Sequence, residues 1–390
     1  ARTTYPDGFP PRQDSPAGCY TDPEFVSRES QAVWQGTWLY AGHVDQLPEP
    51  GRFFVWRYGS APILVVRGDD GAIRAFYNTC RHRGAPIART EEGQLSRAVV
   101  CGYHGWTYDR QGRLRGVSDR RDWPADAAAS RNLIPVRCEL FGNWIFLCEG
   151  ADEPPLAEFL EPIARYIRHL PLESLRLVSR SRHEVACNAK LLIENFLEAF
   201  PFRMLHPGTT DRICDNSGTS IHLWENGHSL MLSPNRRENW VDPGTIGMAE
   251  MASATVIERA HNPSYSIFPN FIVPISATGM PSVCIWPTGV RTSALEVLWF
   301  APGWGAGERP PLWETRIANF DRIVAEDIQF AEPMQATVTS PGFTGVPLNY
   351  QERRIYHWHE EVDRRIGAAL VPPGLAVEPL LDRFVERVDA

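Results

Sequence analysis

Two short loops, each with one cysteine and one histidine, constrain this chain more than any other feature. The first reads CRHRG and contains Cys80 and His82; the second reads CGYHGW and contains Cys101 and His104. Each loop follows a β-rich run and lies at the end of a predicted hairpin. Thiolates and imidazoles in such pairs bind metals. Two hairpins whose loops meet would bring four ligands to one place.

The distribution of cysteine and histidine between the two loops distinguishes the kinds of metal site that they could form. Zinc also accepts two cysteines and two histidines, but zinc fingers group the cysteines in one pair and the histidines on a helix. Here each loop holds one of each kind, 18 residues apart. A two-iron cluster needs this arrangement when one iron takes both thiolates and the other both imidazoles. A zinc site and unrelated side chains in two β-loops remain as alternatives. Gly84, Gly102 and Gly105 permit a tight backbone in the loops.

Short β-rich runs surround the two loops and predict a small all-β domain over residues 45–150. The runs RFFVWRYG, APILVVRG and AIRAFYNTC are separated by turn sequences such as GDDGA, and DRQGR marks another hairpin turn. Before them, residues 22–38 have the apolar spacing of an amphipathic helix. We expect this N-terminal helical segment, residues 1–44, to pack on the C-terminal domain.

Residues 151–390 predict a larger α+β domain. After the linker sequence ADEPPLAEFL come a strand near LVSRSRHEVAC and a helical stretch, LLIENFLEAFPFRMLHPGTT. Several further β-rich runs follow, and then a long helix over about residues 311–336. An antiparallel sheet covered by helices is the arrangement that this order favours.

Composition excludes several broad classes of protein. The net charge of −8 over 390 residues argues against a nucleic-acid partner. No run of 18 apolar residues is present, so no membrane span is predicted. The N-terminal sequence has no apolar signal core, which favours a cytoplasmic location. The eight cysteines are scattered along a long chain, unlike the dense spacing of a secreted disulfide scaffold.

The sequences AFYNTCRHRGAPI and CGYHGWTYD resemble the signature of the Rieske non-haem iron oxygenases, the family of ring-hydroxylating dioxygenase α subunits and of choline- and carnitine-type monooxygenases. The resemblance covers nearly the whole chain. It implies an all-β Rieske [2Fe-2S] domain and a helix-grip (START-like) catalytic-type domain. By this resemblance Cys80 and Cys101 bind one iron, and His82 and His104 bind the other. Histidine ligation raises the reduction potential to about −150 mV or higher.

A second stretch, ENFLEAFPFRMLHP, is similar to the family's motif for a mononuclear iron, but with one departure. The resemblance implies that Asn195 belongs to this motif, that Glu198 is the bridging acid on the electron path and that His206 is one histidine ligand. Pro201 stands where the family has its other histidine. Proline has no side-chain donor atom, and it should end or kink the helix just before it.

Three other histidines are candidates for the missing ligand. No histidine lies between His183 and His206, so a shifted register does not supply one. His183 is a possible substitute, although it falls on a predicted strand well before the helix. His357 and His359 in RIYHWHEE are two residues apart, so they share a face only on a strand. We interpret both as non-ligands.

The carboxylate ligand is predicted from the long helix. Asp327 lies at the edge of an apolar stripe, where a carboxylate is costly unless it is paired or binds a metal. The resemblance agrees, because EDIQF matches the family's Glu-Asp pair, whose Asp binds the iron. The stripe consists of residues three or four apart: Trp313, Ile317, Phe320, Val324 and Ile328.

Plainer interpretations of these residues are also open. Lys190, Glu194 and Glu198 are spaced four apart, which is also typical of a solvated salt-bridge face. His206 could be a capping or core histidine, and Asp327 could pair with an arginine. Because these residues match the family's motif in the same order, the match favours their placement at the metal site. It does not indicate whether the site holds a metal.

The resemblance therefore implies an α-type subunit with a [2Fe-2S] cluster and a degenerate iron site, in which mononuclear Fe(II) is absent. In the family, the cluster of one subunit feeds the iron of its neighbour. We expect this chain to pass electrons to, and assemble with, an active paralogous oxygenase subunit in a trimeric or hexameric ring. The chain has no G-x-G-x-x-G after a strand, so electrons would come from a separate flavin or iron-sulfur reductase that uses NAD(P)H.

The alternative is a self-sufficient monooxygenase or dioxygenase that performs hydroxylation or oxidative demethylation with O2 and NAD(P)H. Its altered iron site would consist of His206 and Asp327, with Glu198 as a candidate third ligand. A redox sensor is a third interpretation. The small-molecule substrate is not readable from the sequence. Five aromatic residues between 220 and 300 either line a pocket, as in an aromatic cage for a quaternary ammonium group, or fill the core: Trp224, Phe268, Phe271, Trp286 and Trp299.

Overall fold

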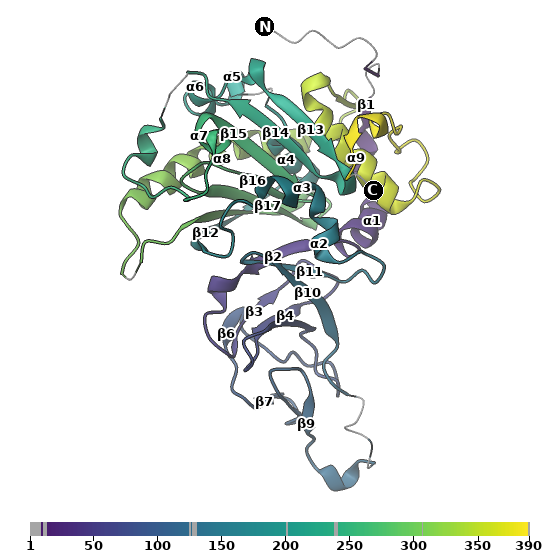
Figure 1. Cartoon of the computed structure of the whole chain (residues 1–390). Coiled ribbons are helices and arrows are strands. Elements are labelled where there is room, and N and C mark those ends of the chain that lie inside the picture. The colour runs from purple at the N-terminus through teal and green to yellow at the C-terminus, as the bar shows by residue number, and fades with distance from the viewer. Residues whose placement is uncertain are drawn as a thin grey trace. The chain divides into compact units, whose positions relative to one another are not determined.

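The computed structural model describes residues 9–10, 14–124, 126, 131–199, 202–237, 241–305 and 307–388 (Figure 1). The chain divides into two compact units. One is Trp34–Leu156, and the other combines Ala1–Val33 with Ala157–Ala390. The smaller unit thus begins at Trp34 and ends at Leu156, where the sequence had suggested residues 45 and 150. The N-terminal segment is part of the larger unit.

The smaller unit is built from strands, as predicted. A sheet of seven strands has the order β2-β11-β10-β5-β4-β3-β6, and a sheet of three has the order β7-β8-β9. The strands are β2 (Leu39–His43), β3 (Arg52–Trp56), β4 (Ile63–Arg67), β5 (Ile73–Tyr77), β6 (Glu92–Gln94), β7 (Val99–Val100), β8 (Thr107–Tyr108), β9 (Leu114–Gly116), β10 (Pro135–Phe141) and β11 (Trp144–Cys148).

The turn sequences act as expected in this unit. Between β4 and β5, the N–H of Gly68 donates to the carbonyl of Ala72 at 2.8 Å. Between β8 and β9, the N–H of Asp109 donates to the carbonyl of Arg113 at 2.9 Å, and Gly112 has a φ of 78°. Such a positive φ suits glycine because it has no Cβ. Both hairpins therefore hold their strands in a fixed register.

The larger unit is built on a sheet of eight strands in the order β12-β18-β17-β16-β15-β14-β13-β20. All neighbours are antiparallel except β13 and β20. The strands are β12 (Leu175–Val185), β13 (Ser220–Trp224), β14 (Ser229–Pro234), β15 (His261–Ile267), β16 (Phe271–Pro274), β17 (Met280–Gly289), β18 (Thr292–Pro302) and β20 (Val385–Glu386), with a separate pair β1 (Asp14–Pro16) and β19 (Gly345–Pro347).

Helices lie against this sheet, as Figure 1 shows for α8 and α4. This arrangement confirms the predicted α+β, helix-grip class. The helices of the chain are α1 (Pro23–Glu29), α2 (Leu156–Phe159), α3 (Glu161–Ile167), α4 (Ala189–Phe196), α5 (Phe202–Leu205), α6 (Thr210–Ile213), α7 (Val256–Ala260), α8 (Leu312–Thr337) and α9 (Arg353–Ile366).

Local sequence explains where the main helices begin and which face they bury. The Asn188 side chain accepts a hydrogen bond from the N–H of Lys190 and so caps α4. On α8, Trp313 and Phe320 pack against Trp299 of β18, with ring centroids 5.5 and 5.7 Å apart. The apolar stripe of α8 therefore faces the sheet.

The predicted N-terminal helix is shorter than expected. Helix α1 begins after Asp22, whose side chain accepts a hydrogen bond from the N–H of Phe25 at 2.8 Å, and it ends at Glu29. A single π-helical turn, Ser30–Trp34, follows it. Trp34 is also where the strand-rich unit begins, so the helical pattern stops at the boundary between the two units.

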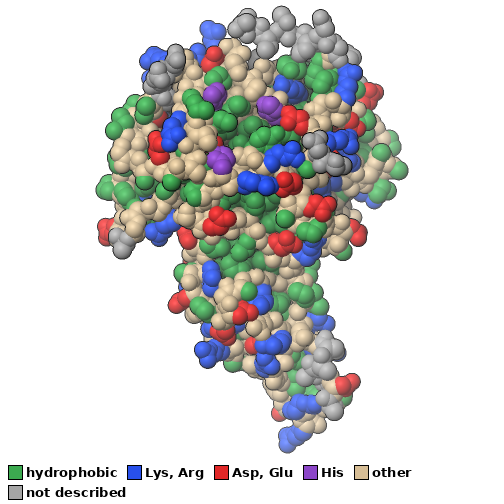
Figure 2. Space-filling model, in the orientation of Figure 1, with side chains coloured by type: hydrophobic (Ala, Val, Ile, Leu, Met, Phe, Trp, Pro, Cys, Tyr) green, Lys and Arg blue, Asp and Glu red, His purple; other side chains and the backbone are tan. Residues whose placement is uncertain are grey.

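The visible surface of the larger unit carries acidic and basic side chains in a mixed pattern, without a broad field of one sign (Figure 2). Mixed charge of this kind does not resemble a nucleic-acid footprint. Among the described residues, no helix is both long enough and apolar enough to cross a membrane.

Candidate metal centres

The two cysteine-histidine loops share one backbone design. In each loop the cysteine N–H donates to the carbonyl five residues later, at 2.8 Å in both cases. The glycine four residues after the cysteine donates back to the cysteine carbonyl, from Gly84 at 3.0 Å and from Gly105 at 2.9 Å. These glycines have φ values of 76° and 72°, which a side chain would strain. Two equivalent knuckles therefore present Cys80 and Cys101.

The four predicted cluster ligands come together as two pairs. The Cys80 and Cys101 thiols are each 2% exposed and lie within hydrogen-bonding reach of one another. The rings of His82 and His104 have centroids 4.6 Å apart. The Nδ1 atom of His82 is buried and has no hydrogen-bond partner among the described residues. A buried nitrogen without a partner is costly unless a metal uses it.

The pairing of two thiols and two imidazoles suits a two-iron cluster. Within the described part of the chain, no three His, Cys, Asp or Glu side chains converge as a site for one metal ion. A Rieske cluster needs only two protein ligands on each iron, because bridging sulfides supply the rest. The predicted set of Cys80, His82, Cys101 and His104 meets that requirement.

Two aromatic residues support these ligands and were not singled out from the sequence. Trp106 stacks on His82 with ring centroids 5.0 Å apart and planes 7° apart. The Tyr108 hydroxyl accepts a hydrogen bond from the N–H of Arg81 at 3.0 Å and lies 3.5 Å from the Cys80 sulfur. Because that oxygen accepts from Arg81, its own hydrogen is free to point at the sulfur. Both residues stand in the motif CGYHGWTY, which was the available signal.

The second candidate centre unites residues that are far apart in the sequence. His206 is 5% exposed, and its Nε2 lies 3.0 Å from Oδ1 of Asp327 on α8. Its Nδ1 lies 2.8 Å from Oε2 of Glu326, which also accepts a hydrogen bond from the Thr209 hydroxyl at 2.6 Å. Glu326 thus fixes the orientation of the His206 ring. The sequence did not single out Glu326 or Thr209, although Glu326 is the first acid of the matched Glu-Asp pair.

The Oδ1 atom of Asp327 faces the His206 ring in a buried setting. It is buried and makes no well-aligned hydrogen bond in the described structure, although Nε2 of His206 lies close to it. Two neighbouring ligands, each about 2.1 Å from one metal, would lie about 3 Å apart. Burial raises the pKa of Asp327, while the polar contacts with His206 and Asn195 lower it. An imidazole and a carboxylate held this way suit iron(II).

The third ligand position is where the sequence departs from the family. Pro201, together with the predicted end of the helix at that proline, lies outside the described residues. Before it, α4 ends at Phe196. The Glu198 carboxyl group hydrogen-bonds to Glu352, and Asp327 is among its electrostatic neighbours. Burial, with the neighbouring charge of Glu352, raises the pKa of Glu198 to about 9.

Lys190 and Glu194 on α4 are buried, so the interpretation of a solvated salt-bridge face is wrong for these two residues. Lys190 is 2% exposed and forms an ion pair with Glu29, which is 3% exposed. Oε1 of Glu194 accepts hydrogen bonds from the Tyr20 hydroxyl at 2.7 Å and from Nε2 of His359 at 2.8 Å. These contacts tie α4 to the N-terminal segment and to α9.

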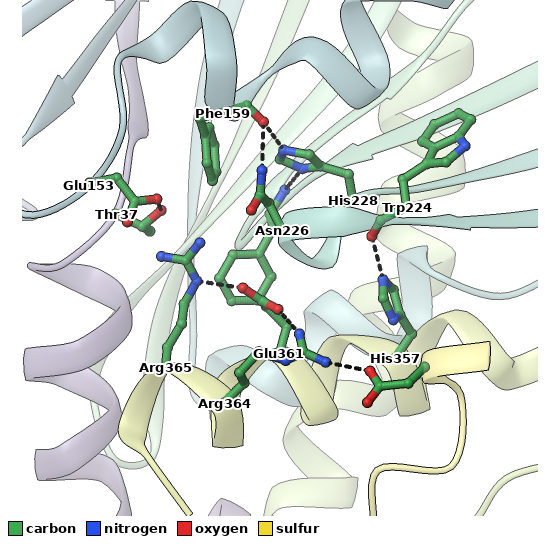
Figure 3. Close-up of polar contacts among 12 residues, drawn as sticks. Thr37, Glu153, Phe159, Trp224, Asn226, His228, His357, Glu361, Arg364 and Arg365 are labelled. Atoms are coloured by element: carbon green, nitrogen blue, oxygen red, sulfur yellow. Dashed lines mark hydrogen bonds and ion pairs between the residues drawn. The ribbon is translucent and has the colours of Figure 1, made fainter. Parts of the chain in front are cut away.

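The other histidines have different surroundings. Nε2 of His183 is buried without a hydrogen-bond partner among the described residues, and its electrostatic neighbour is Asp321 rather than Asp327. His357 lies on α9, where its Nε2 donates to the carbonyl of Trp224 at 2.9 Å (Figure 3). Residues 357 and 359 are therefore on a helix and do not share a face. Neither His357 nor His359 is placed as a ligand of the His206–Asp327 pair by these contacts.

The five aromatic residues considered as pocket walls are buried in the larger unit. Several pack on other core side chains, as Trp299 does on Trp313 and Phe268 does on Trp358. Their role in the core is therefore clear, whereas a cage is not evident from their contacts. Each is at most 2% exposed: Trp224, Phe268, Phe271, Trp286 and Trp299.

Comparison with known families agrees with this geometry. Residues 172–368 match the family described as "Ring hydroxylating alpha subunit (catalytic domain)", and residues 37–127 match "Rieske [2Fe-2S] domain". The chain belongs to the Rieske oxygenase α subunits. The family and the fold class predicted from the sequence are thereby confirmed. So is the presence of a Rieske [2Fe-2S] domain.

Curated relatives of this α subunit include enzymes with quaternary ammonium names. The glycine betaine monooxygenase oxygenase subunit of Chromohalobacter salexigens is 30% identical over 204 residues, which cover 52% of this chain and 45% of the relative. The chloroplastic choline monooxygenase of Spinacia oleracea is 26% identical over 355 residues, covering 88% and 76%. The match thus spans less than half the length of the bacterial relative.

Solved structures share the fold of this α subunit. A quaternary ammonium Rieske monooxygenase, described in connection with carnitine oxidation and inter-subunit electron transfer, has a TM-score of 0.78 at 18% identity, covering 94% of this chain and all of that one. Naphthalene 1,2-dioxygenase from Rhodococcus sp., bound to indole, has a TM-score of 0.72 at 21% identity, covering 92% and 94%. At these identities the likeness establishes the fold alone.

Proposed function

We propose that this chain is the electron-carrying subunit of a Rieske oxygenase, with a complete cluster site and an incomplete mononuclear iron site. The observation that carries the proposal is Pro201, which occupies the first-histidine position of ENFLEAFPFRMLHP. A proline side chain has no atom that can bind iron. The chain then retains one imidazole, His206, and one carboxylate, Asp327, of a three-ligand set.

The smaller unit supports the electron-carrying role. When bound, a Rieske cluster accepts and releases one electron at a raised potential. The protein buries both thiols, whereas the His82 and His104 rings are only partly buried. Next to the second loop, Val100 and Tyr103 are 55% and 57% exposed. Exposed apolar side chains beside the cluster suit contact with another protein. The imidazole side is thus the natural exit for an electron.

The larger unit supports the loss of iron. Glu198, proposed as the bridging acid on the electron path, hydrogen-bonds to Glu352, and burial raises its pKa. Asn195 hydrogen-bonds to Asp327 and holds the carboxylate in place. With two ligands the site would hold iron(II) weakly. Electrons from this chain would therefore serve a neighbouring subunit.

This function requires two partners. One is a reductase that uses NAD(P)H through a flavin or iron-sulfur centre. The other is a paralogous oxygenase subunit with histidine at the position equivalent to Pro201, assembled with this chain in a trimeric or hexameric ring. A neighbouring gene for such a subunit is a simple discriminating observation, and its absence would weigh heavily against the proposal.

Iron content is the direct test. We expect anaerobically purified protein to hold about two irons per chain, with the EPR spectrum of a reduced histidine-ligated cluster. Added iron(II) should then dissociate readily. About three irons per chain, with the third retained after desalting, would overturn the incomplete-site proposal but not the cluster assignment.

The second candidate is a self-sufficient oxygenase, favoured by the contact of 3.0 Å between Oδ1 of the buried Asp327 and Nε2 of His206. It would hydroxylate or demethylate a small molecule, and quaternary ammonium compounds are suggested by the relatives' names. The test is NAD(P)H-dependent O2 consumption by this chain with a reductase and choline or glycine betaine. Product formation that disappears in Asp327→Ala would select this candidate.

A further inference from the structure

Arg354 is a fully buried cation in the first turn of α9. Its side chain is 0% exposed and contacts strands β14 and β15. Its Nε donates to the Ser229 hydroxyl at 3.0 Å, and its Nη2 donates to the Ser264 carbonyl at 3.1 Å. Its Nη1 is buried and has no hydrogen-bond partner among the described residues. Both of these bonds are to neutral oxygens.

Two other cations in this unit, one buried and one partly buried, have acidic partners. Lys190 pairs with Glu29, and Arg365 donates from Nε to Glu361 at 2.7 Å (Figure 3). For Arg354, burial lowers the pKa to about 9, and no acidic side chain among the described residues opposes this effect. The guanidinium stays protonated at neutral pH. A buried charge without a counter-ion is unfavourable, and an anion bound at the guanidinium would offset that cost.

A second unsatisfied group lies beside this guanidinium. Ser229 and Ser266 are directly opposite in the β14–β15 pairing, so their side chains lie on the same face of the sheet as neighbours. Ser229 already accepts a hydrogen bond from Arg354. The Ser266 hydroxyl is 1% exposed and has no hydrogen-bond partner in the described structure. Two strands and one helix thus gather two free donors, Nη1 and Oγ of Ser266.

The position of Arg354 relates it to the candidate iron site. Two residues before it, Glu352 hydrogen-bonds to Glu198 just after α4. Further along the same helices, His359 hydrogen-bonds to Glu194. The two helices therefore run side by side, and the first turn of α9 lies at the end of α4 from which Asn195 reaches Asp327. A small ligand anchored at Arg354 would lie in the neighbourhood of that centre.

We propose that Arg354 and Ser266 bind the carboxylate of a small organic ligand within the larger unit. A carboxylate brings one negative charge for one guanidinium and accepts hydrogen bonds in a plane that matches the guanidinium edge. A phosphate would carry more charge than this single cation offsets. The inference goes beyond the proposed electron-carrying function and does not depend on mononuclear iron.

Ligand-dependent thermal unfolding of the cluster-loaded protein tests the proposal without turnover. The probes are acetate and glycine betaine, which carry a carboxylate, against choline chloride and NaCl at equal ionic strength. Both carboxylates should raise the Tm of the wild type, whereas the two chlorides should not. Arg354→Met should abolish that rise, and Arg364→Met on an exposed part of the same helix should preserve it.

A second pair of variants distinguishes loss of carboxylate binding from misfolding of the variant protein. Ser266→Ala removes one small hydroxyl and leaves Arg354 in place, so it should fold and bind acetate about tenfold more weakly. Arg354→Lys keeps the charge but loses the planar fork, and it should retain partial binding. Equal stabilisation of wild type and Arg354→Met by the carboxylates, or stabilisation by chloride alone, would overturn the proposal. The iron count plays no part in this readout, so the two proposals fail separately.

Discussion

In the function proposed above, the two units of this chain differ in how completely they keep their metal ligands. The smaller unit presents Cys80, His82, Cys101 and His104 from two knuckles with matching backbone hydrogen bonds. The larger unit keeps one histidine and one aspartate in contact, and a proline fills the third position. Under the proposed function, the chain would store an electron but would not activate oxygen by itself.

If the proposed function is correct, the fold of the larger unit has persisted after its chemistry was reduced. The contacts that hold the second centre are present: His206 Nδ1 lies against the Glu326 carboxylate, and Asn195 hydrogen-bonds to Asp327. Buried ion pairs still tie α4 to its neighbours. These contacts stabilise the unit whether or not iron is bound, so loss of one ligand need not unfold it. The comparison predicts that the two centres respond in opposite ways to single substitutions.

The largest effect is expected from removing a cluster ligand. Cys101→Ser replaces a thiolate with a weak hydroxyl ligand, and we expect cluster content, measured as iron, sulfide and visible absorbance, to fall more than about tenfold. Cys138→Ser in the same unit is the matched control, since Cys138 lies on β10 away from the two loops. Retention of the cluster in Cys101→Ser would show that Cys101 is not a required cluster ligand, and the smaller unit would then no longer be the unit with the complete ligand set.

The next effect is a gain in the weaker centre. Pro201→His restores the missing imidazole, so iron should rise from about two to about three per chain. Pro201→Ala is the control, because it relaxes the backbone without adding a ligand. A third iron in Pro201→His but not in Pro201→Ala would show that this one residue decides whether the mononuclear site holds iron. No gain would mean that the site has changed beyond that position, and equal gain in both variants would assign the defect to backbone geometry.

The unequal centres also explain what the sequence could predict. The cluster ligands fall within 25 residues on two hairpins, so local spacing alone was enough to predict them. His206 and Asp327 are 121 positions apart, and resemblance was needed to pair them. The roles of Glu326, Glu352 and Arg354 depend on packing between helices and strands, which periodicity does not report. The spacing of Lys190 and Glu194 even suggested a solvated face, because it cannot tell a buried ion pair from an exposed one.

The stability of the larger unit should fall with pH, an effect of intermediate size that distinguishes this unit from the smaller one. His228 donates from Nε2 to the carbonyl of Phe159 at 2.8 Å and accepts at Nδ1 from the N–H of Phe268 at 3.1 Å (Figure 3). Burial lowers the pKa of His228 to about 3. Protonation of Nδ1 would also place a second ring N–H against the N–H of Phe268. As pH falls from about 6.5 toward 3, only the unfolded chain gains that proton, so stability should drop by about 1.4 kcal/mol per pH unit.

Urea unfolding at pH 7 and pH 5 measures this loss. His228→Gln should be less stable than the wild type at pH 7 but should show a smaller loss on acidification, by about 2 kcal/mol over that range. His222→Gln, at a half-exposed histidine, is the control and should keep the wild-type pH dependence. Visible absorbance of the cluster, followed in the same titration, reports the smaller unit separately. An unchanged slope in His228→Gln would exclude His228 as the cause.

The smallest expected effect is a change in the reduction potential of the cluster in the smaller unit. The Tyr108 hydroxyl accepts from Arg81 and lies 3.5 Å from the Cys80 sulfur, to which it can donate. Such a bond stabilises the more negative, reduced cluster. Tyr108→Phe should therefore lower the reduction potential by on the order of 60 mV, a tenfold change for one electron. Tyr103→Phe, at an exposed tyrosine in the second loop, is the matched control. If both variants keep the wild-type potential, the hydroxyl serves only to fix the loop backbone, and the tuning of this centre must come from burial and its imidazoles.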